Sequence, residues 1–123
     1  MEFTNDMPIY LQLKKMVEEG IITGTYHTDD TLPSIRNLAQ GYRLNPQTVA
    51  SAFSELMNDG VIYKKRGLGF FVAEKARENL LQRRKVEFYE KDVSEFAKIV
   101  NFLGIEINEI CELLKKRIEE ESR

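Results

Sequence analysis

The sequence predicts an α+β protein in which a mixed N-terminal domain, residues 1–73, is followed by an all-α tail, residues 74–123. Three observations support this prediction. Apolar residues recur at helical spacing through the first sixty residues. Two short apolar runs between residues 61 and 72 flank a basic, glycine-containing turn, as in a β-hairpin. Beyond residue 74 the composition shifts to helix formers without any strand pattern.

The composition limits the class of protein. The chain has 123 residues, 42% hydrophobic and 31% charged, which indicates one modest soluble domain with an extension. No apolar run is long enough to span a membrane, and Met1 to Asp6 has no signal-peptide pattern, so we expect a cytoplasmic protein without a membrane partner. Cys111 is the only cysteine, so no internal disulfide is expected, and we expect it to be a small buried residue of a helix.

The distribution of charge is more informative than its total. The net charge of −2 argues mildly against nucleic acid, because nucleic-acid binders are usually basic. Thr31 to Ala73, however, contains five basic and two acidic residues, a local excess of three positive charges. Any contact with DNA phosphates must therefore come from the middle of the chain.

The first predicted helix starts around Asp6 and Pro8 and ends before Gly24. Its apolar stripe consists of Ile9, Leu13, Met16, Val17 and Ile21. Tyr26 to Leu32 is polar and is expected to be a connecting loop. This loop contains His27, the only histidine, which we expect to be solvated rather than to act as a ligand or base, because no partner is near it.

Two short helices follow. Pro33 and Ser34 open the first, with Ser34 as its N-cap. Asn45 caps the second, and Pro46 suits its first position. The small Ala39 lets the two helices approach closely, so the pair is predicted to form a helix-turn-helix.

The second of these helices carries a possible reading surface. Val49, Ala52, Phe53 and Leu56 form one apolar face, which leaves neutral polar side chains outside. Amides and hydroxyls in an exposed first turn can match the donors and acceptors of base edges. The alternative is an ordinary amphipathic surface helix.

Beyond Gly60 the pattern changes to two strands, Val61 and Ile62 and then Phe70 to Val72, around a turn from Lys64 to Gly69. A helix, a helix-turn-helix and a hairpin, in that order, make a winged helix. The basic turn is then a candidate contact to phosphates or to the minor groove, and its glycines permit close backbone approach.

The tail carries two apolar stripes that it cannot bury alone. The first follows an a/d spacing from Val86 to Leu103, and Gly104 separates it from a second helix. A second copy of the chain is the simplest partner; the alternative is that the helices fold back on their own N-terminal domain. The predicted dimer interface comprises Val86, Tyr89, Val93, Phe96, Val100, Leu103, Ile107, Ile110 and Leu114.

Four blocks of sequence resemble the N-terminal domain of GntR-family bacterial transcription regulators: PIYLQLKKMVEEGIITG, LPSIRNLA, LNPQTVASAFSELMNDG and KRGLGFFV. They span Met7 to Val72, and the short two-helix tail resembles the YtrA-type branch. The resemblance implies a homodimeric DNA-binding regulator, commonly a repressor. It also implies DNA contacts from Ser34 and Arg36, from the start of the reading helix and from the wing tip.

Residue type and resemblance together give one set of candidate DNA-binding residues: Ser34, Arg36, Asn45, Gln47, Thr48, Ser51, Lys64, Lys65, Arg66, Gly67 and Gly69. Two positions depart from the family pattern. Asp29 stands where relatives usually have glycine, which suggests a different loop path. Ser51 stands where many have Lys or Arg, which weakens one phosphate contact that Lys64 and Lys65 would compensate.

We therefore expect a homodimer that places two helices in successive major grooves of a near-palindromic double-stranded DNA operator. The alternative is a winged-helix module that binds proteins and no DNA. An enzyme is not expected, because the sequence lacks the common zinc, phosphate-loop and dinucleotide motifs. No cofactor or metal is expected either. A small-molecule effector between two tails, beside Tyr89, Phe96 and Phe102, is a lesser possibility.

Overall fold

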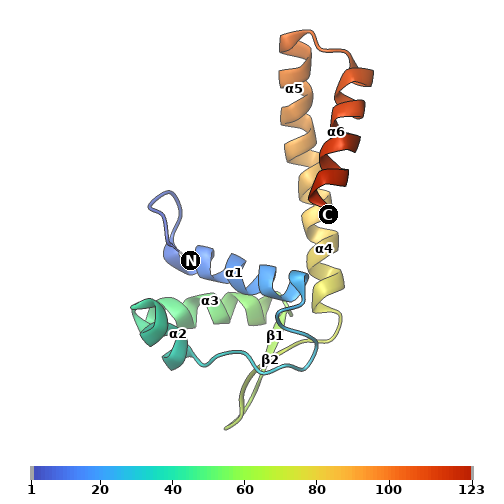
Figure 1. The fold of residues 1–123 in the computed structure, drawn as a ribbon. Helices are drawn as coiled ribbons and strands as arrows, with labels where there is room; N and C mark the ends of the chain where they lie inside the picture. The colour runs from blue at the N-terminus through green and yellow to red at the C-terminus, as the bar shows by residue number, and fades with distance from the viewer. Residues whose placement is uncertain (1, 123) are drawn as a thin grey trace. The chain divides into compact units, whose positions relative to one another are not determined.

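A computed structural model describes residues 2–122 and has two compact units, Met1–Gln82 and Arg83–Arg123. The N-terminal unit contains three helices and a two-stranded antiparallel hairpin, followed by the start of a fourth helix (Figure 1). The elements are α1 (Ile9–Thr23), α2 (Ile35–Tyr42), α3 (Pro46–Asn58), β1 (Ile62–Lys65), β2 (Gly69–Val72) and α4 (Ala76–Glu87). The predicted winged-helix order and α+β class are confirmed.

The core of this unit is built around α3. Val49, Ala52, Phe53 and Leu56 are completely buried, as their helical spacing predicts. Figure 1 shows α1 lying along α3, and Leu13, Val17 and Ile21 of α1 are buried in the same cluster. The reading helix is therefore held by its whole apolar face, while its first turn remains accessible.

Both N-caps predicted for the helix-turn-helix are present. The Ser34 hydroxyl accepts a hydrogen bond from the Asn37 amide at 3.0 Å, and Asn45 Oδ1 accepts one from the Gln47 amide at 2.9 Å. Each bond satisfies an amide that has no partner within its helix. Arg43 ends α2 in the left-handed conformation, with φ of 54°. The turn between the helices is thus defined by local interactions at both ends.

The hairpin pairs Ile62 with Val72 and Lys65 with Gly69, so Lys64, Lys65 and Gly69 lie in the strands. Only Arg66 to Leu68 form the connection, a shorter turn than the sequence predicts. The expectation of a plain loop over Tyr26 to Leu32 is also wrong in part. Thr31 bridges to Phe71, and the amide of Leu32 donates to the carbonyl of Phe70 at 2.9 Å. The end of that loop therefore adds a third pairing to the hairpin.

The N-terminal segment is fastened to α1 by the buried Gln12. Its amide group donates to the carbonyls of Thr4 and Met7, at 2.8 and 2.7 Å, and its oxygen accepts from the Thr4 amide at 2.9 Å. Phe3 meets Tyr42 of α2 edge to face, with ring centroids 5.7 Å apart. These contacts brace the segment before α1 against the end of α2.

The first turns of α4 belong to the N-terminal unit. Ala76 and Leu80 are buried in its core, and Arg77 Nε donates to the carbonyl of Ile22 at 2.9 Å. The units consequently divide between Gln82 and Arg83, nine residues beyond the sequence-based boundary after residue 73. Composition changes at residue 74, whereas packing continues to Leu80.

The C-terminal unit is helical. α4 is followed by the π-helical segment η1 (Phe88–Asp92), then by α5 (Val93–Leu103) and α6 (Ile107–Glu121). Gly104, with φ of 66°, ends α5 as the sequence predicts. The uninterrupted α-helix implied by the a/d spacing is wrong, because a π turn adds a residue and rotates the positions that follow it. Within residues 2–122, every helix is too short or too polar to span a lipid bilayer.

A charged contact also joins α1 to the end of α3. Lys14 Nζ lies 2.8 Å from an Asp59 carboxylate oxygen and 3.8 Å from Glu55, and only 20% of the Lys14 side chain is exposed. Burial lowers the pKa of Lys14, but the hydrogen bond and charge of Asp59 outweigh it, so this pKa lies above its ordinary value of 10.5.

Replacing this lysine, Lys14→Met, should lower the free energy of unfolding by about 1 kcal/mol at pH 7, because two acidic groups lose their cation. A raised lysine pKa adds stability below its unfolded value and loses it as pH rises through the folded value. The difference from wild type should therefore shrink above about pH 10.5. Urea unfolding of both proteins at pH 7 and at pH 11 measures this difference in the free energy of unfolding. The exposed neighbour provides a control, Lys15→Met, and equal losses from both variants would contradict the account.

Candidate nucleic-acid interface

The first turn of α3 presents neutral polar groups. Gln47 is exposed and Thr48 is half-buried, and both follow the Asn45 cap and Pro46. The side-chain oxygen of Asn45 is already engaged in capping, so its remaining group is the amide NH₂. Gln47 is the residue here whose side chain is best placed to offer a donor and an acceptor together.

Ser51, one turn further along, is less available than its sequence position suggests. It is half-buried, and its hydroxyl donates to the carbonyl of Gln47 at 3.0 Å. Its proton is therefore directed into the helix. The hydroxyl is therefore less free to contact a phosphate than its place on the outer face of α3 suggests.

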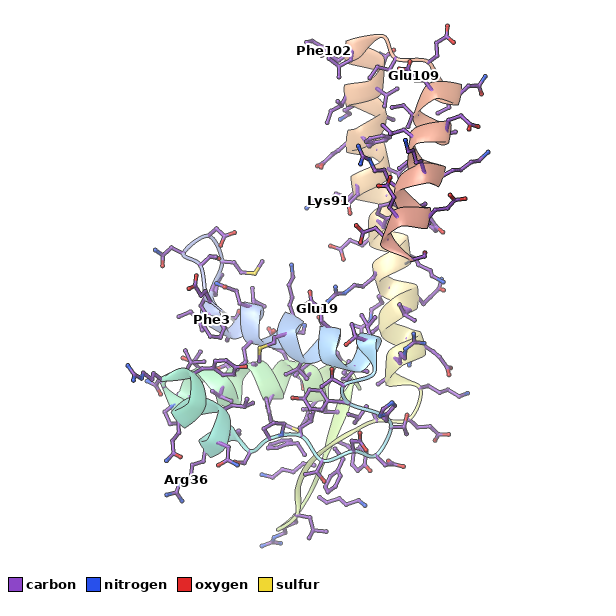
Figure 2. The ribbon with its side chains drawn as sticks, viewed as in Figure 1. Phe3, Glu19, Arg36, Lys91, Phe102 and Glu109 are labelled. Atoms are coloured by element: carbon purple, nitrogen blue, oxygen red, sulfur yellow. The ribbon has the colours of Figure 1, made fainter. Side chains whose placement is uncertain are left out.

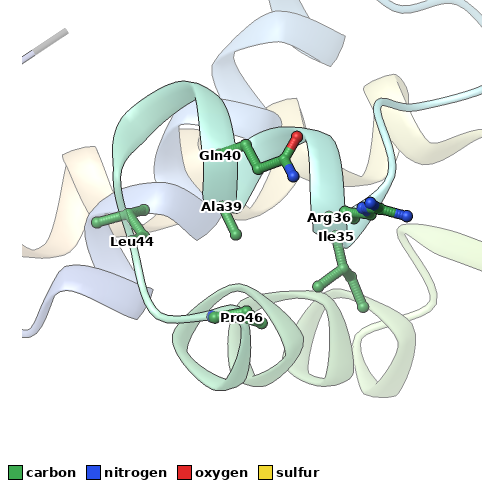
Figure 3. Close-up of a pocket in the computed structure, with 6 residues that line it drawn as sticks. All are labelled: Ile35, Arg36, Ala39, Gln40, Leu44 and Pro46. Atoms are coloured by element: carbon green, nitrogen blue, oxygen red, sulfur yellow. The ribbon is translucent and has the colours of Figure 1, made fainter.

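A groove separates the exposed edge of α2 from the start of α3 (Figure 3). Its volume is about 570 Å³, and it is lined by Ile35, Arg36, Ala39, Gln40, Leu44 and Pro46. Arg36 is exposed and extends away from α2 (Figure 2). Gln40 is not among the residues that the sequence predicts for this site, although its position one helical turn after Arg36 could have indicated it. The groove brings these two polar side chains beside the start of α3.

The wing displays its lysines on opposite faces, because successive strand residues alternate. Lys64 lies over the ring of Phe70, 5.5 Å from its centroid. Lys65 lies over Tyr63 and Phe71, at 5.8 and 5.0 Å. The rings hold the ammonium groups near the hairpin while leaving them exposed, which suits contacts with phosphates. Arg66 and Gly67 follow in the exposed turn.

The face that carries Lys65 is tied to the loop before α2. Tyr63 stacks on Phe71, and its hydroxyl donates to an Asp29 carboxylate oxygen at 2.7 Å. This hydrogen bond raises the pKa of Tyr63 above its ordinary value. Asp29 itself has φ of 65°, a conformation that favours glycine. That geometry explains why glycine suits this position, and aspartate here adds a link to the wing.

The wing and the reading helix meet through two phenylalanines. Phe53 of α3 and Phe70 of β2 pack edge to face, with centroids 4.8 Å apart and planes at 87°. Phe53 is completely buried and Phe70 nearly so. Phe70 is also the ring beneath Lys64, so this pair links the basic wing directly to α3.

The predicted dimer residues remain largely exposed within the C-terminal unit. A groove of about 520 Å³ lies beside η1, α5 and α6, and it is lined by Phe88, Asp92, Val93, Phe96, Ile107, Ile110, Cys111 and Leu114. Val86, Tyr89 and Leu103 are exposed and Val100 is half-buried. The expectation that Cys111 is buried is wrong: it is exposed, because α5 and α6 have no buried residues in the single chain.

A helix-turn-helix beside a basic β-hairpin defines the winged-helix class of double-stranded DNA-binding proteins. A family model described as "Bacterial regulatory proteins, gntR family" matches residues 9–72. The chain belongs to this GntR family and is a DNA-binding transcription regulator, not an enzyme. The family resemblance of the four sequence blocks is thereby confirmed.

Relatives that match this chain over most of their own length agree with this assignment. The chain is 30% identical to the HTH-type transcriptional repressor YtrA of Bacillus subtilis, over 89% of this chain and 83% of the relative. A GntR-family regulator from Listeria monocytogenes has a TM-score of 0.79 at 34% identity, covering 93% of this chain and 98% of that one. Both matches include the tail, which is consistent with the YtrA-type branch.

A second similar structure includes DNA. AraR(DBD) in complex with operator ORR3 has a TM-score of 0.54 at 30% identity, over 59% of this chain and 86% of that chain.

The contact between wing and helix can be measured with a double-mutant cycle. Phe53→Leu and Phe70→Leu should each destabilise the protein, and the double variant should lose about 1 kcal/mol less than the sum, because one aromatic contact is removed twice. Denaturant unfolding supplies the four free energies. Phe71 lies on the other face, so a cycle with Phe53→Leu and Phe71→Leu should show little coupling. Equal coupling in both cycles would contradict a specific Phe53–Phe70 contact.

Proposed function

We propose that the chain is a homodimeric repressor that reads a near-palindromic operator with α3 and grips it with the wing. The observation that carries this proposal is that contact between Phe53 and Phe70 packs a basic hairpin against a helix whose start is exposed and uncharged. Gln47 and Thr48 supply base discrimination in the major groove. Arg36, Lys64, Lys65 and Arg66 supply phosphate contacts.

Other members of the predicted site have supporting roles. Ser34 and Asn45 fix the two helix starts through their capping bonds. Gly67 and Gly69, at φ of 78° and 102°, allow the turn to approach the minor groove closely. Ser51 contributes at most a short polar contact, because its hydroxyl is bonded to the Gln47 carbonyl.

The tail is the dimerisation element of this proposal. Large apolar side chains of η1, α5 and α6 are exposed in the single chain, including Phe88, Phe96, Ile107 and Leu114. Exposed apolar area on this scale marks an interaction surface, and a second copy covers it with like residues. Dimeric helix-turn-helix proteins place their half-sites about one DNA turn apart, ~34 Å.

Two observations bear on the remaining alternatives. The operator complex of the similar AraR(DBD) disfavours a protein-binding module that never meets DNA. The name of YtrA as a repressor supports repression. A small effector would have the apolar groove beside Phe96 available. Phe102, near the end of α5 (Figure 2), is 87% exposed and is not among the residues that line this groove. Tyr89 is not among the residues that line this groove either.

Base reading is tested with Gln47→Ala on a duplex that wild-type protein enriches from a random pool. The variant should lose on the order of 1 to 3 kcal/mol on that duplex and little on random DNA, because an amide contact to a base edge is specific. Fluorescence anisotropy titration measures both affinities. The exposed glutamine of α4 serves as the control, Gln82→Ala. An equal loss on both duplexes would remove Gln47 from the reading role.

Phosphate contact by the wing is tested with Lys65→Gln. Binding should weaken on every sequence, and the slope of log affinity against log salt should fall by about one unit, because one counterion fewer is released. Binding titrations between about 50 and 200 mM salt give this slope. The exposed lysine of α1 is the control, Lys15→Gln, and it should keep the wild-type slope. An unchanged slope for the wing variant would show that Lys65 does not meet DNA.

Dimerisation through the tail is tested with Phe96→Asp, which places a charge in the apolar groove. The variant should be monomeric at micromolar concentration by sedimentation equilibrium, and its affinity for the enriched duplex should fall on the order of 100-fold, because two linked half-site contacts become one. Asn101→Asp adds the same charge to the exposed side of α5. A monomeric wild type, or a dimeric Phe96→Asp protein, would contradict this role of the tail.

A further inference from the structure

The wing ends in an exposed apolar side chain. Leu68 is 67% exposed, whereas the other exposed large hydrophobic residues described in the N-terminal unit, Ile9 and Met57, are 40% and 36% exposed. Leu68 lies in the three-residue turn between β1 and β2, and its amide donates to the Lys65 carbonyl at 2.9 Å. An isolated exposed leucine is unremarkable on a helix, but this one is at the tip of a basic hairpin.

The residues on both sides of Leu68 have no side chains. Gly67 and Gly69 both have positive φ, and a Cβ placed on either would meet nothing within 4 Å. Open space around both glycines means that neither is required by packing inside this chain. They leave a narrow tip at which Leu68 is the apolar side chain and Arg66 the charged one, and a B-DNA minor groove is only about 6 Å wide.

The hairpin behind this tip is braced on both faces. Phe70 packs on the buried Phe53, and on the other face Tyr63 stacks on Phe71 and is bonded to Asp29. The pairing of Thr31 with Phe71 adds a third segment to the sheet. A side chain that separates stacked bases needs such support, because unstacking costs a few kcal/mol per step.

We propose that Leu68 is an apolar wedge that enters the minor groove and partly unstacks one base step beside each half-site. This inference rests on the proposed function, because it requires the wing to meet duplex DNA. Lys64, Lys65 and Arg66 are close to Leu68 in sequence and on the hairpin, and they hold the phosphates that flank the step. Leucine is one of the side chains that minor-groove proteins insert in this way.

The wedge gives the wing a specificity of its own. Pyrimidine–purine steps such as TA and CA unstack most easily, so they should be preferred at the position that Leu68 enters. The DNA should also bend away from the wing, towards the major groove. Leu68 is thus a specificity-determining residue that acts through the deformability of DNA, whereas Gln47 reads base edges.

The test uses the full chain and a duplex enriched by the wild-type protein from a random pool. Energy transfer between dyes at the duplex ends reports bending. 2-Aminopurine, placed in turn at each step beside the half-site, reports unstacking through increased fluorescence. The variants are Leu68→Ala, which removes the wedge, and Leu68→Met, which preserves a long apolar side chain. Met57→Ala is the control, because it shortens an exposed apolar residue outside the site.

Wild type, Leu68→Met and Met57→Ala should bend the duplex and raise the 2-aminopurine signal at one step. Leu68→Ala should lose most of both signals and bind on the order of tenfold more weakly, with an unchanged salt slope, because no phosphate contact is lost. If wild type binds but neither bends nor unstacks the duplex, or if Leu68→Ala matches it, the wedge is wrong and the proposed function stands. If wild type enriches no duplex, the proposed function fails first.

Discussion

The packing of Phe53 holds the functional parts of this protein in one arrangement. Its ring is completely buried on α3 and meets Phe70 of the wing at 4.8 Å, so a residue of the reading helix also anchors the hairpin. Because buried aromatic contacts tolerate little displacement, the first turn of α3 and the basic wing are kept in a fixed relation. In the proposed complex, two rigid elements meet the duplex together, so the ordering cost on binding is small.

The packing of the wing also positions its charged side chains. The chain has a net charge of −2, but Lys64, Lys65 and Arg66 lie together on a hairpin that also carries the buried Phe70. Lys64 and Lys65 rest on aromatic rings that are themselves fixed, by Phe53 on one face and by the bond from Tyr63 to Asp29 on the other. The two ammonium groups are therefore held in position within the free chain. The acidic Asp59 and Glu55 are directed to Lys14 of α1.

Features set by neighbouring residues could be predicted from the sequence. The caps Ser34 and Asn45 and the buried face of α3 depend on spacings of two to seven residues. The pairing of Thr31 with Phe71 could not be predicted, because it joins segments forty residues apart, and the alternation signal in the polar loop is too weak. The π turn at Phe88–Asp92 could not be predicted, because a/d counting assumes an uninterrupted helix. Assignment of the dimer and DNA-contact residues needs a partner molecule.

Selection of bound duplexes from a random pool by the purified wild-type protein tests the central claim most directly. The account predicts an inverted repeat, with two half-sites that share one orientation-reversed motif and a constant separation. A twofold-symmetric dimer has two identical helix and wing pairs, so it should select two copies of one motif in opposite orientation. Recovery of a single unrepeated motif, or of sequences no different from the starting pool, would contradict it.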